Sequence, residues 1–369
     1  FPHPPSAGRQ HGGCCGLISF VTSSRRFDTI RVLVPGTRTR FRCGGLSVAL
    51  QTARLLETLR KTEVVTYRER ESGFPFLTDL LQQEEPLPNV LWLVSWGFDV
   101  PLLLRRLRGH SVIYQAHSSG YGFDLPAGVP VLAVSRNTLG YWGDRAPRNP
   151  LFLLPNALEP QWLACLQRGE AMDERAIDVL IQKRKSSPYV LNHLVPALRA
   201  KGLRVEVQDG WVDDLVGLFQ SASVYIYDSA EHWRSAGVSE GFGLPPLEAL
   251  ACGCVVFSSF NHALADVLTP GLSAHQIGQG LLSHDVARIE AAVQRPGDWR
   301  PNRQQLVSLL SSFSESALHQ RWDETLKSLD SWYDRVSLQS NEPFLCTPAL
   351  WWQRLRRILG GLKRRLRSR

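Results

Sequence analysis

The sequence predicts an α/β protein of two domains, each built around a mostly parallel sheet. At 369 residues the chain is long for one domain and comfortable for two. Short β-branched runs alternate with segments of helical periodicity, and this alternation starts twice, near residue 30 and again near residue 177. Strands that alternate with helices favour parallel sheets, because each helix returns the chain to the edge where the next strand begins.

The first domain is expected over residues 28–170. Its opening strand, Ile30–Val34, is followed by Gly44 and Gly45 and then by an amphipathic segment over Leu46–Leu59. A strand, a glycine-containing turn and a helix form the start of a nucleotide-binding type of α/β unit. Further strands are expected at Val64–Tyr67, Val90–Val94, Val112–Gln115 and Val131–Val134.

The second domain is expected over residues 171–301, after the polar segment Gln167–Arg175, which has the composition of a domain boundary. Strands are expected there at Ile177–Ile181, Val205–Val207, Val224–Tyr227 and Cys254–Ser258. Residues 302–338 are predicted to form helices at the domain junction that cross back to the first domain. These helices carry an apolar stripe of Trp322, Leu326, Leu329, and Trp332 with Tyr333. Cys252 and Cys254 lie in an apolar stretch and are interpreted as small core residues rather than metal ligands.

The net charge of +8 comes from one end of the chain. Residues 349–369 hold eight Arg and Lys and no acid, so the rest of the chain balances, with 34 basic residues (42 less eight) against 34 acidic ones. This distribution argues against a nucleic-acid-binding body and for a local partner of the tail.

Residues 339–369 are interpreted as a linker and an amphipathic tail helix. Its apolar side chains share one helical face: Trp351, Trp352, Leu355, Ile358, Leu359, Leu362 and Leu366. Tryptophans beside a basic face suit an anionic membrane surface, although a solvated or RNA-binding tail would explain the charge too. No run of about 18 apolar residues occurs, so no membrane-spanning helix is expected.

The seven cysteines are scattered without paired CxxC motifs, which fits a reducing compartment. We therefore expect a cytoplasmic protein held at the inner face of a membrane by its tail. Residues 1–27 are expected to be disordered, or to come from a misplaced start of the reading frame.

A twelve-residue segment, SEGFGLPPLEAL, carries the chemistry. Gly241 and Gly243 let the backbone approach a ligand closely, and the following proline pair predicts that a helix begins near Pro246. The free N–H groups of that helix would form an anion site suited to a diphosphate. Glu240 in the loop and Glu248 in the first helical turns would approach one ligand from different elements. Acids near a helix N-terminus also occur for stability alone, but the complete string favours a ligand site.

This segment resembles the E-x7-E motif of retaining glycosyltransferases of family 4, which have the GT-B fold of two Rossmann-like domains facing each other across a cleft. The resemblance covers most of residues 30–270. Shorter motifs follow in the family's order: the glycine turn Gly44-Gly45, the histidine His117 after a strand, and the segments Ala133-Val134-Ser135 and Leu154-Pro155-Asn156. The resemblance implies a retaining glycosyltransferase that moves a sugar from a nucleotide-sugar donor to a glycan, lipid-linked or polysaccharide acceptor.

The resemblance also implies roles for single residues. Glu240 would lie beside the transferred sugar and the leaving phosphate, and Glu248 would bind the ribose hydroxyls. His117 would contact the transferred sugar, although a histidine by itself is more often structural. The other donor-binding residues would be Gly44, Gly45, Gly241, Phe242, Gly243, Leu244, Arg184 and Lys185; the last two would hold the diphosphate, unless they form only a solvated basic turn.

The implied path is front-face attack through an oxocarbenium-like transition state, with the charge on the departing diphosphate offset by Arg184, Lys185 and the helix N-terminus. No DxD-like metal clamp stands in a convincing place, since Asp213-Asp214 is better interpreted as a helix cap. Neither a metal nor another cofactor is therefore expected.

The chain departs from the family pattern at three places. The second domain is expected to lack one strand–helix unit after Val207. Eleven residues, Asp228–Val238, separate the strand from the motif, which is more than the family usually has. Asn261–Asp266 stands where the family often has a Gly-Gly-x-x-Glu turn.

Two other functions stay open on the sequence. A phosphorylase would use the same fold, but no lysine motif for pyridoxal phosphate stands out. A membrane- or nucleic-acid-binding protein with an idle catalytic site would explain the basic tail, but the intact Glu240 and Glu248 pair argues against it. No specific nucleic-acid partner is expected.

Overall fold

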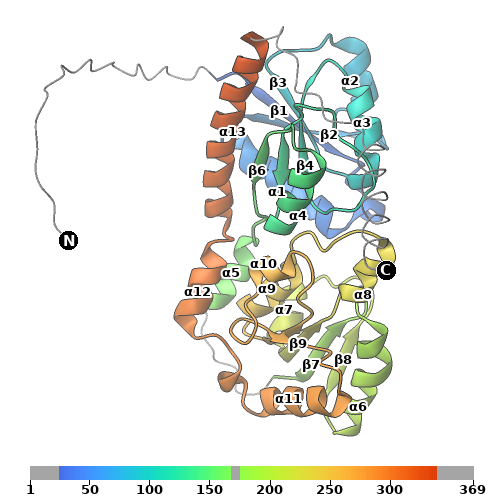
Figure 1. The fold of residues 1–369 in the computed structure, drawn as a ribbon, viewed down its shortest axis with the longest axis vertical. Helices are drawn as coiled ribbons and strands as arrows, with labels where there is room; N and C mark the ends of the chain where they lie inside the picture. Colours follow the sequence, from blue (N-terminus) through green and yellow to red (C-terminus); the bar gives the residue numbers. More distant parts are fainter. Residues whose placement is uncertain (1–24, 168–174, 339–369) are drawn as a thin grey trace, which may run out of the picture.

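The computed structural model describes residues 25–167 and 175–338. These residues form two α/β domains stacked along the long axis of the molecule (Figure 1). Every strand pair in both sheets is parallel. The fold class predicted from the sequence is confirmed.

The first domain is built on a six-stranded sheet in the order β2-β1-β3-β4-β5-β6. The β-branched runs of the sequence form its central strands, which are buried on both faces, as in most parallel sheets. The strands are β1 (Thr29–Val34), β2 (Lys61–Thr66), β3 (Val90–Val94), β4 (Ser111–Ala116), β5 (Val131–Ala133) and β6 (Leu151–Leu153). The helices are α1 (Gly44–Glu57), α2 (Leu77–Gln83), α3 (Val100–Arg106) and α4 (Arg136–Arg145), with 3-10 turns η1 (Thr39–Phe41) and η2 (Gly97–Asp99).

The second domain is built on a five-stranded sheet in the order β11-β10-β9-β7-β8. The strands are β7 (Ile177–Gln182), β8 (Val205–Gln208), β9 (Ala222–Tyr227), β10 (Val255–Ser258) and β11 (His275–Gln276). The helices are α6 (Val195–Ala200), preceded by the π-turn η3 (Val190–Leu194), α7 (Leu215–Gln220), α8 (Ala230–Ala236), α9 (Leu244–Ala251), α10 (Leu264–Val267) and α11 (Leu282–Gln294), with the 3-10 turn η4 (Pro296–Asp298).

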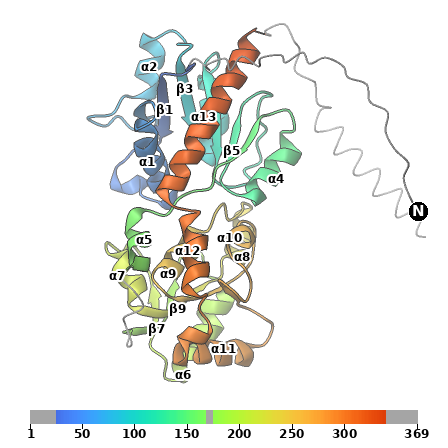
Figure 2. The same cartoon turned by 90° about the vertical axis from the view of Figure 1, so that its left-hand side faces the viewer.

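Two helices at the C-terminal end of the described chain connect the domains. The helix α12 (Arg303–Ser311) packs on the second domain, and α13 (Glu315–Leu338) runs back along the first (Figures 1 and 2). The stripe predicted from the sequence is buried there, since Trp322, Leu326 and Leu329 all lie in the core of the first domain. The chain therefore returns from the second domain to the first through α12 and α13.

The helix α5 (Pro160–Gln167) packs on the second domain, although its residues fall within the segment predicted for the first. Trp162 of α5 meets the ring of Phe219 with ring centroids 5.8 Å apart. Near the crossing point, the Leu158 N–H donates to the Phe313 carbonyl at 2.8 Å. The chain therefore passes between the domains before α5 and returns just after α12.

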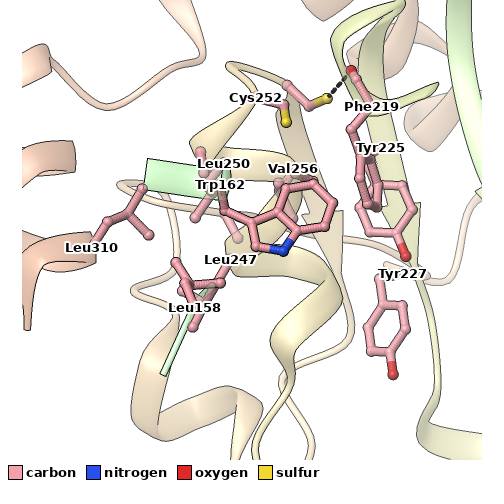
Figure 3. Packing of buried hydrophobic residues seen from close by; sticks show 14 of the residues in the cluster. Leu158, Trp162, Phe219, Tyr225, Tyr227, Leu247, Leu250, Cys252, Val256 and Leu310 are labelled. Carbon is pink, nitrogen blue, oxygen red and sulfur yellow. Dashed lines mark hydrogen bonds between the residues drawn. The ribbon is translucent and has the colours of Figure 1, made fainter. Parts of the chain in front are cut away.

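The core beneath α9 surrounds Trp162, Tyr225 and Leu247 (Figure 3). Cys252 and Cys254 are buried in this cluster, and the Cys254 thiol donates to the Phe219 carbonyl at 3.2 Å. Both cysteines are thus core residues, as the sequence predicts. The cluster fixes α9 against the sheet and thereby fixes the loop that precedes it.

The predicted boundary at residue 27 lies slightly too far along the chain. Phe27, placed in the segment expected to be disordered or misassigned, is fully buried in the core of the first domain. Its ring meets Tyr333 of α13 edge to face at 5.0 Å, and its carbonyl accepts a hydrogen bond from Arg60. A large aromatic side chain gains enough from burial to order the backbone that carries it. Residues 1–24 lie outside the described chain.

Among the described residues, none of the helices is long and apolar enough to span a bilayer. The predicted tail helix over 349–369 and the linker before it lie outside the described residues.

Candidate functional site

The two domains meet where the carboxyl end of β4 faces the glycine loop before α9. His117 follows β4 directly, and Gly241 lies against it so closely that a Cβ added to Gly241 would stand 1.4 Å from the His117 carbonyl oxygen. No side chain fits at that distance, so glycine is required at this point of contact. The contact brings His117 and Glu240, which are far apart in the sequence, to the same place.

A cluster of serines closes the seam beside this contact. The Ser118 hydroxyl donates to the Ser239 carbonyl at 2.6 Å, and the Ser119 N–H donates to the Ser239 hydroxyl at 2.9 Å. The Ser239 N–H donates in turn to the Ser119 carbonyl at 3.1 Å. All three side chains are buried. Because each polar group has a partner, this contact between the domains costs no unsatisfied hydrogen bond.

Glu240 is buried and held by several donors. Its Oε2 accepts from the Tyr227 hydroxyl at 2.5 Å, from Trp233 Nε1 at 2.7 Å and from the Ser229 hydroxyl at 3.3 Å. Its Oε1 faces Lys185, with Nζ 3.7 Å away. Burial and the nearby Glu240 carboxylate raise the pKa of Tyr227 well above its usual value, so this hydroxyl stays a donor. Hydrogen bonds to a charged acceptor are strong, which fixes the orientation of the carboxylate.

The backbone of Glu240 is fixed as well. Its N–H donates to Nδ1 of His262 at 3.2 Å, and its carbonyl accepts from the Ala263 N–H at 3.4 Å. His262 has φ of 54°, in the left-handed region that side chains other than glycine seldom adopt. These contacts come from the Asn261–Asp266 segment, which departs from the family pattern.

The two basic residues after β7 behave differently. Lys185 has φ of 74° and turns its ammonium group inward, 3.3 Å from the Tyr227 hydroxyl. Arg184 is exposed, and no polar partner for it occurs in the part of the chain that the structure describes. Lys185 thus lies beside Glu240, whereas Arg184 stays available to a ligand.

The start of α9 differs from the prediction in a way that matters for anion binding. The helix begins at Leu244, with Gly243 at the cap position and φ of 95°, rather than near Pro246. Pro245 and Pro246 therefore occupy the first turn, where neither offers an N–H. The anion site expected at the helix N-terminus is thus weaker than predicted.

The glycine loop compensates for the two prolines. The N–H groups of Gly241, Phe242 and Gly243 donate to no other group within the described residues. The Phe242 ring is buried against Phe313, with ring centroids 5.3 Å apart, so it anchors the loop rather than covering it. Backbone donors held in this way suit the oxygens of a sugar or a phosphate.

Glu248 projects from the second turn of α9 and is partly exposed. Burial, with Glu159 facing it, raises the pKa of Glu248 to about 8, and Lys185 opposes that shift. At neutral pH its carboxyl group is therefore mostly protonated while no ligand is bound. It makes no ion pair among the described residues, so its oxygens remain open to a hydroxyl-bearing ligand.

His117 is partly exposed, but its Nε2 is buried and has no hydrogen-bond partner among the described residues. Burial lowers the pKa of His117 to about 4, so the ring is neutral near pH 7. An unpaired polar atom at a contact between domains is costly unless a ligand satisfies it.

Gly44 and Gly45 form the first turn of α1 and are exposed. A Cβ on Gly44 would meet nothing within 4 Å, and one on Gly45 would meet only the Cys43 thiol at 3.8 Å. The fold itself therefore does not require glycine here, which leaves room for a ligand beside the start of the helix.

Within residues 25–167 and 175–338 no cluster of three or more His, Cys, Asp or Glu could hold a metal ion. Asp214 caps α7, with its carboxylate accepting from the Gly217 N–H at 2.8 Å. The interpretation of Asp214 as a helix cap is confirmed.

Sequence reasoning missed four groups that hold Glu240, namely Tyr227, Ser229, Trp233 and His262. Trp233 lies on α8, inside the eleven residues by which the chain departs from the family pattern. The unusual length of this segment was the only feature of the sequence that pointed to these groups, and it did not indicate a role for any single residue. A cavity of about 350 Å³ opens beside α8, lined by Trp233, Arg234, Ser119 and His262 among others.

The two parallel-sheet α/β domains match the GT-B architecture, which consists of two Rossmann-like domains. Residues 202–295, which contain the glycine loop and both acids of the motif, match the family model of glycosyl transferases group 1. No curated protein matches this sequence. Together the family match and the fold support a GT-B glycosyltransferase.

Several solved structures share the fold at low sequence identity. HepE of Anabaena, in complex with UDP and glucose, is 15% identical, with a TM-score of 0.55 over 81% of this chain and 99% of that one. Sucrose-phosphate synthase of Thermosynechococcus elongatus is 13% identical, with a TM-score of 0.57 over 82% and 99%. The pneumococcal O-GlcNAc transferase GtfA, in complex with UDP and GlcNAc, is 8% identical, with a TM-score of 0.55 over 82% and 99%.

Proposed function

We propose that this protein is a retaining glycosyltransferase that moves a sugar from a nucleotide-sugar donor to a glycan, lipid-linked or polysaccharide acceptor. The observation that carries the proposal is the Glu240 carboxylate, buried at the seam between the domains and fixed by three donors on one oxygen. It lies within the segment that matches the family model. An acid fixed beside unpaired backbone donors can contact a sugar hydroxyl and face a leaving phosphate at the same time.

The contacts support a proposed role for each donor-site residue. Glu240 would bind the transferred sugar, and His117 would satisfy its buried Nε2 on a sugar hydroxyl. The loop from Gly241 to Leu244 would offer N–H groups to the sugar and the phosphates. Glu248, open and uncharged when the site is empty, would take the ribose hydroxyls, while Gly44 and Gly45 would let the diphosphate approach α1. The solved complexes of HepE with UDP and glucose and of GtfA with UDP and GlcNAc make a UDP-sugar the first donor class to test.

Departure of the diphosphate builds negative charge, which must be offset where it forms. Lys185 and Arg184 supply two positive charges after β7, and the glycine loop supplies backbone dipoles. We infer that these groups suffice and that transfer needs no metal ion. Full activity in excess EDTA is expected, and activity that EDTA removes and Mg²⁺ or Mn²⁺ restores would contradict this inference.

A thermal-shift screen of nucleotides and nucleotide sugars identifies the donor, and a transfer assay then tests the site. Glu240→Ala should abolish transfer while the protein stays folded, because the carboxylate contacts the reacting sugar. Glu206→Ala removes an exposed acid of β8 and serves as the control with unchanged transfer. Wild-type turnover in Glu240→Ala would refute the assignment of Glu240, whereas no transfer by the wild-type protein with any donor that it binds would favour a binding protein with an idle site.

We also propose that the protein works in the cytoplasm at the inner face of a membrane. The support is the basic, tryptophan-containing sequence of residues 349–369, which suits an anionic lipid surface. An enzyme that meets lipid-linked or surface-assembled acceptors would gain from this location.

A further inference from the structure

The segment between β9 and Glu240 forms a short helix, α8, for which the family resemblance provides no role. None of the residues of α8 is buried, so the helix adds little to the hydrophobic core. The cavity of about 350 Å³ beside it shows that one of its sides is not packed. Its closest polar contact with the rest of the domain is made by one side chain, Trp233, which reaches Glu240.

Trp233 determines how the Glu240 carboxylate is oriented. Its indole N–H donates to Oε2 at 2.7 Å, alongside the Tyr227 hydroxyl at 2.5 Å and the Ser229 hydroxyl at 3.3 Å. Three donors saturate this oxygen, and Oε1 is left with the Lys185 ammonium group 3.7 Å away. An indole nitrogen can only donate a hydrogen bond, so in this contact the Glu240 carboxylate must be the acceptor. A carboxylate held by one oxygen presents the other to a ligand.

The same indole ring holds Lys185. The Lys185 ammonium lies 4.6 Å from the centre of the Trp233 ring, within the range of a cation–π interaction. The lysine backbone has φ of 74°, an unfavourable conformation that nearby contacts must stabilise. Trp233 therefore contacts both Glu240, on the sugar side of the proposed site, and the positively charged Lys185, on the phosphate side.

We propose that Trp233 is a positioning residue of the transfer reaction: it holds Glu240 with Oε1 toward the transferred sugar and keeps Lys185 beside the leaving diphosphate. The inference rests on the proposed function, because it assigns Trp233 a role only through those two residues. The proposal gives the extra segment Asp228–Val238 a role, because its helix α8 carries the indole that reaches the buried Glu240 carboxylate.

The test uses Trp233→Phe, which keeps an aromatic ring for Lys185 but removes the N–H that bonds to Glu240, together with part of the indole. With the donor identified by the thermal-shift screen, kcat should fall about 10- to 100-fold, the loss expected for one hydrogen bond to a charged group. The KM for the donor should change less than threefold, and calorimetric affinity for UDP or GDP alone should not change. Trp233→Ala also removes the ring, so it should additionally weaken binding of the nucleotide diphosphate.

The matched control is Trp211→Phe. Trp211 is exposed, and its Nε1 donates to the Asp213 carboxylate at 2.9 Å, so the variant loses the same type of bond elsewhere. Its kcat should equal that of the wild type. Tyr227→Phe removes a second donor from Oε2 and also the hydroxyl 3.3 Å from the Lys185 ammonium. It should lower kcat as well, and it replaces Trp233→Phe if that variant fails to fold.

Three results would overturn the inference. The first is wild-type kcat in Trp233→Phe, or in Tyr227→Phe where it replaces that variant. The second is a loss of UDP or GDP affinity as large as the loss of kcat, which would indicate a purely structural role. The third is a fall in the kcat of Trp211→Phe as large as that of Trp233→Phe, since the loss would then not depend on the bond to Glu240. Absence of transfer by the wild-type protein with every nucleotide sugar that it binds would instead refute the proposed function.

Discussion

Gly241→Ala perturbs the contact on which the closed arrangement of the two domains depends. The new Cβ would stand 1.4 Å from the His117 carbonyl oxygen, whereas real Cβ contacts are not shorter than 3.0 Å. The glycine loop and the end of β4 must therefore separate by about 1.6 Å, the difference between these distances. The atom in the way belongs to the backbone, so no side-chain rotation can relieve the overlap. A shift of this size exceeds the 1 Å misplacement that costs about 100-fold in rate.

We expect Gly241→Ala to lower kcat at least about 100-fold, with the domains still folded. The assay is the transfer rate at saturating donor, together with a thermal melt. Gly140→Ala is the matched control, because its Cβ would meet nothing within 4 Å and it lies in the helix α4. That control should keep wild-type kcat and melt at the same temperature or slightly higher, since alanine favours helices by about 1 kcal/mol over glycine. Wild-type turnover in Gly241→Ala would refute the closed contact as the reactive arrangement.

Three further predictions concern stability and location. The pKa of Glu248, raised to about 8, means that the folded state favours the protonated carboxyl group. The stability that this group contributes is complete below its unfolded pKa and is lost as the pH rises through 8. In melts from pH 5 to 9, the free energy of unfolding should therefore fall relative to that of Glu248→Gln, by at most about 1.4 kcal/mol per pH unit. Trp322→Ala should lower the free energy of unfolding in denaturant by about 3–5 kcal/mol, because this side chain of α13 is fully buried in the core of the first domain. A loss below about 1 kcal/mol would contradict the packing. Removal of residues 349–369 should release the protein from anionic vesicles while nucleotide binding persists, and equal sedimentation of both forms would exclude the tail as the anchor.

The amino-acid sequence determined the features that repeat locally along the chain. The alternation of β-branched runs and helical segments predicted two parallel sheets, and the apolar stripe of residues 302–338 predicted helices there. Both predictions follow from hydrophobic periodicity, which can be recognised within a single segment of the sequence. The spacing of Glu240 and Glu248 around a glycine loop likewise marked the candidate site, because the acids and the glycines are neighbours in the chain.

The tertiary structure decided how those residues are held and which charge they carry. Trp233 and Lys185 reach Glu240 from different elements, and His117 touches Gly241 across the seam between two domains. Burial sets the pKa of Glu248 near 8, which the sequence could not predict since burial depends on what packs around the side chain. A hydrogen bond or a pKa depends on distances between residues far apart in the sequence, and only the folded chain fixes those distances.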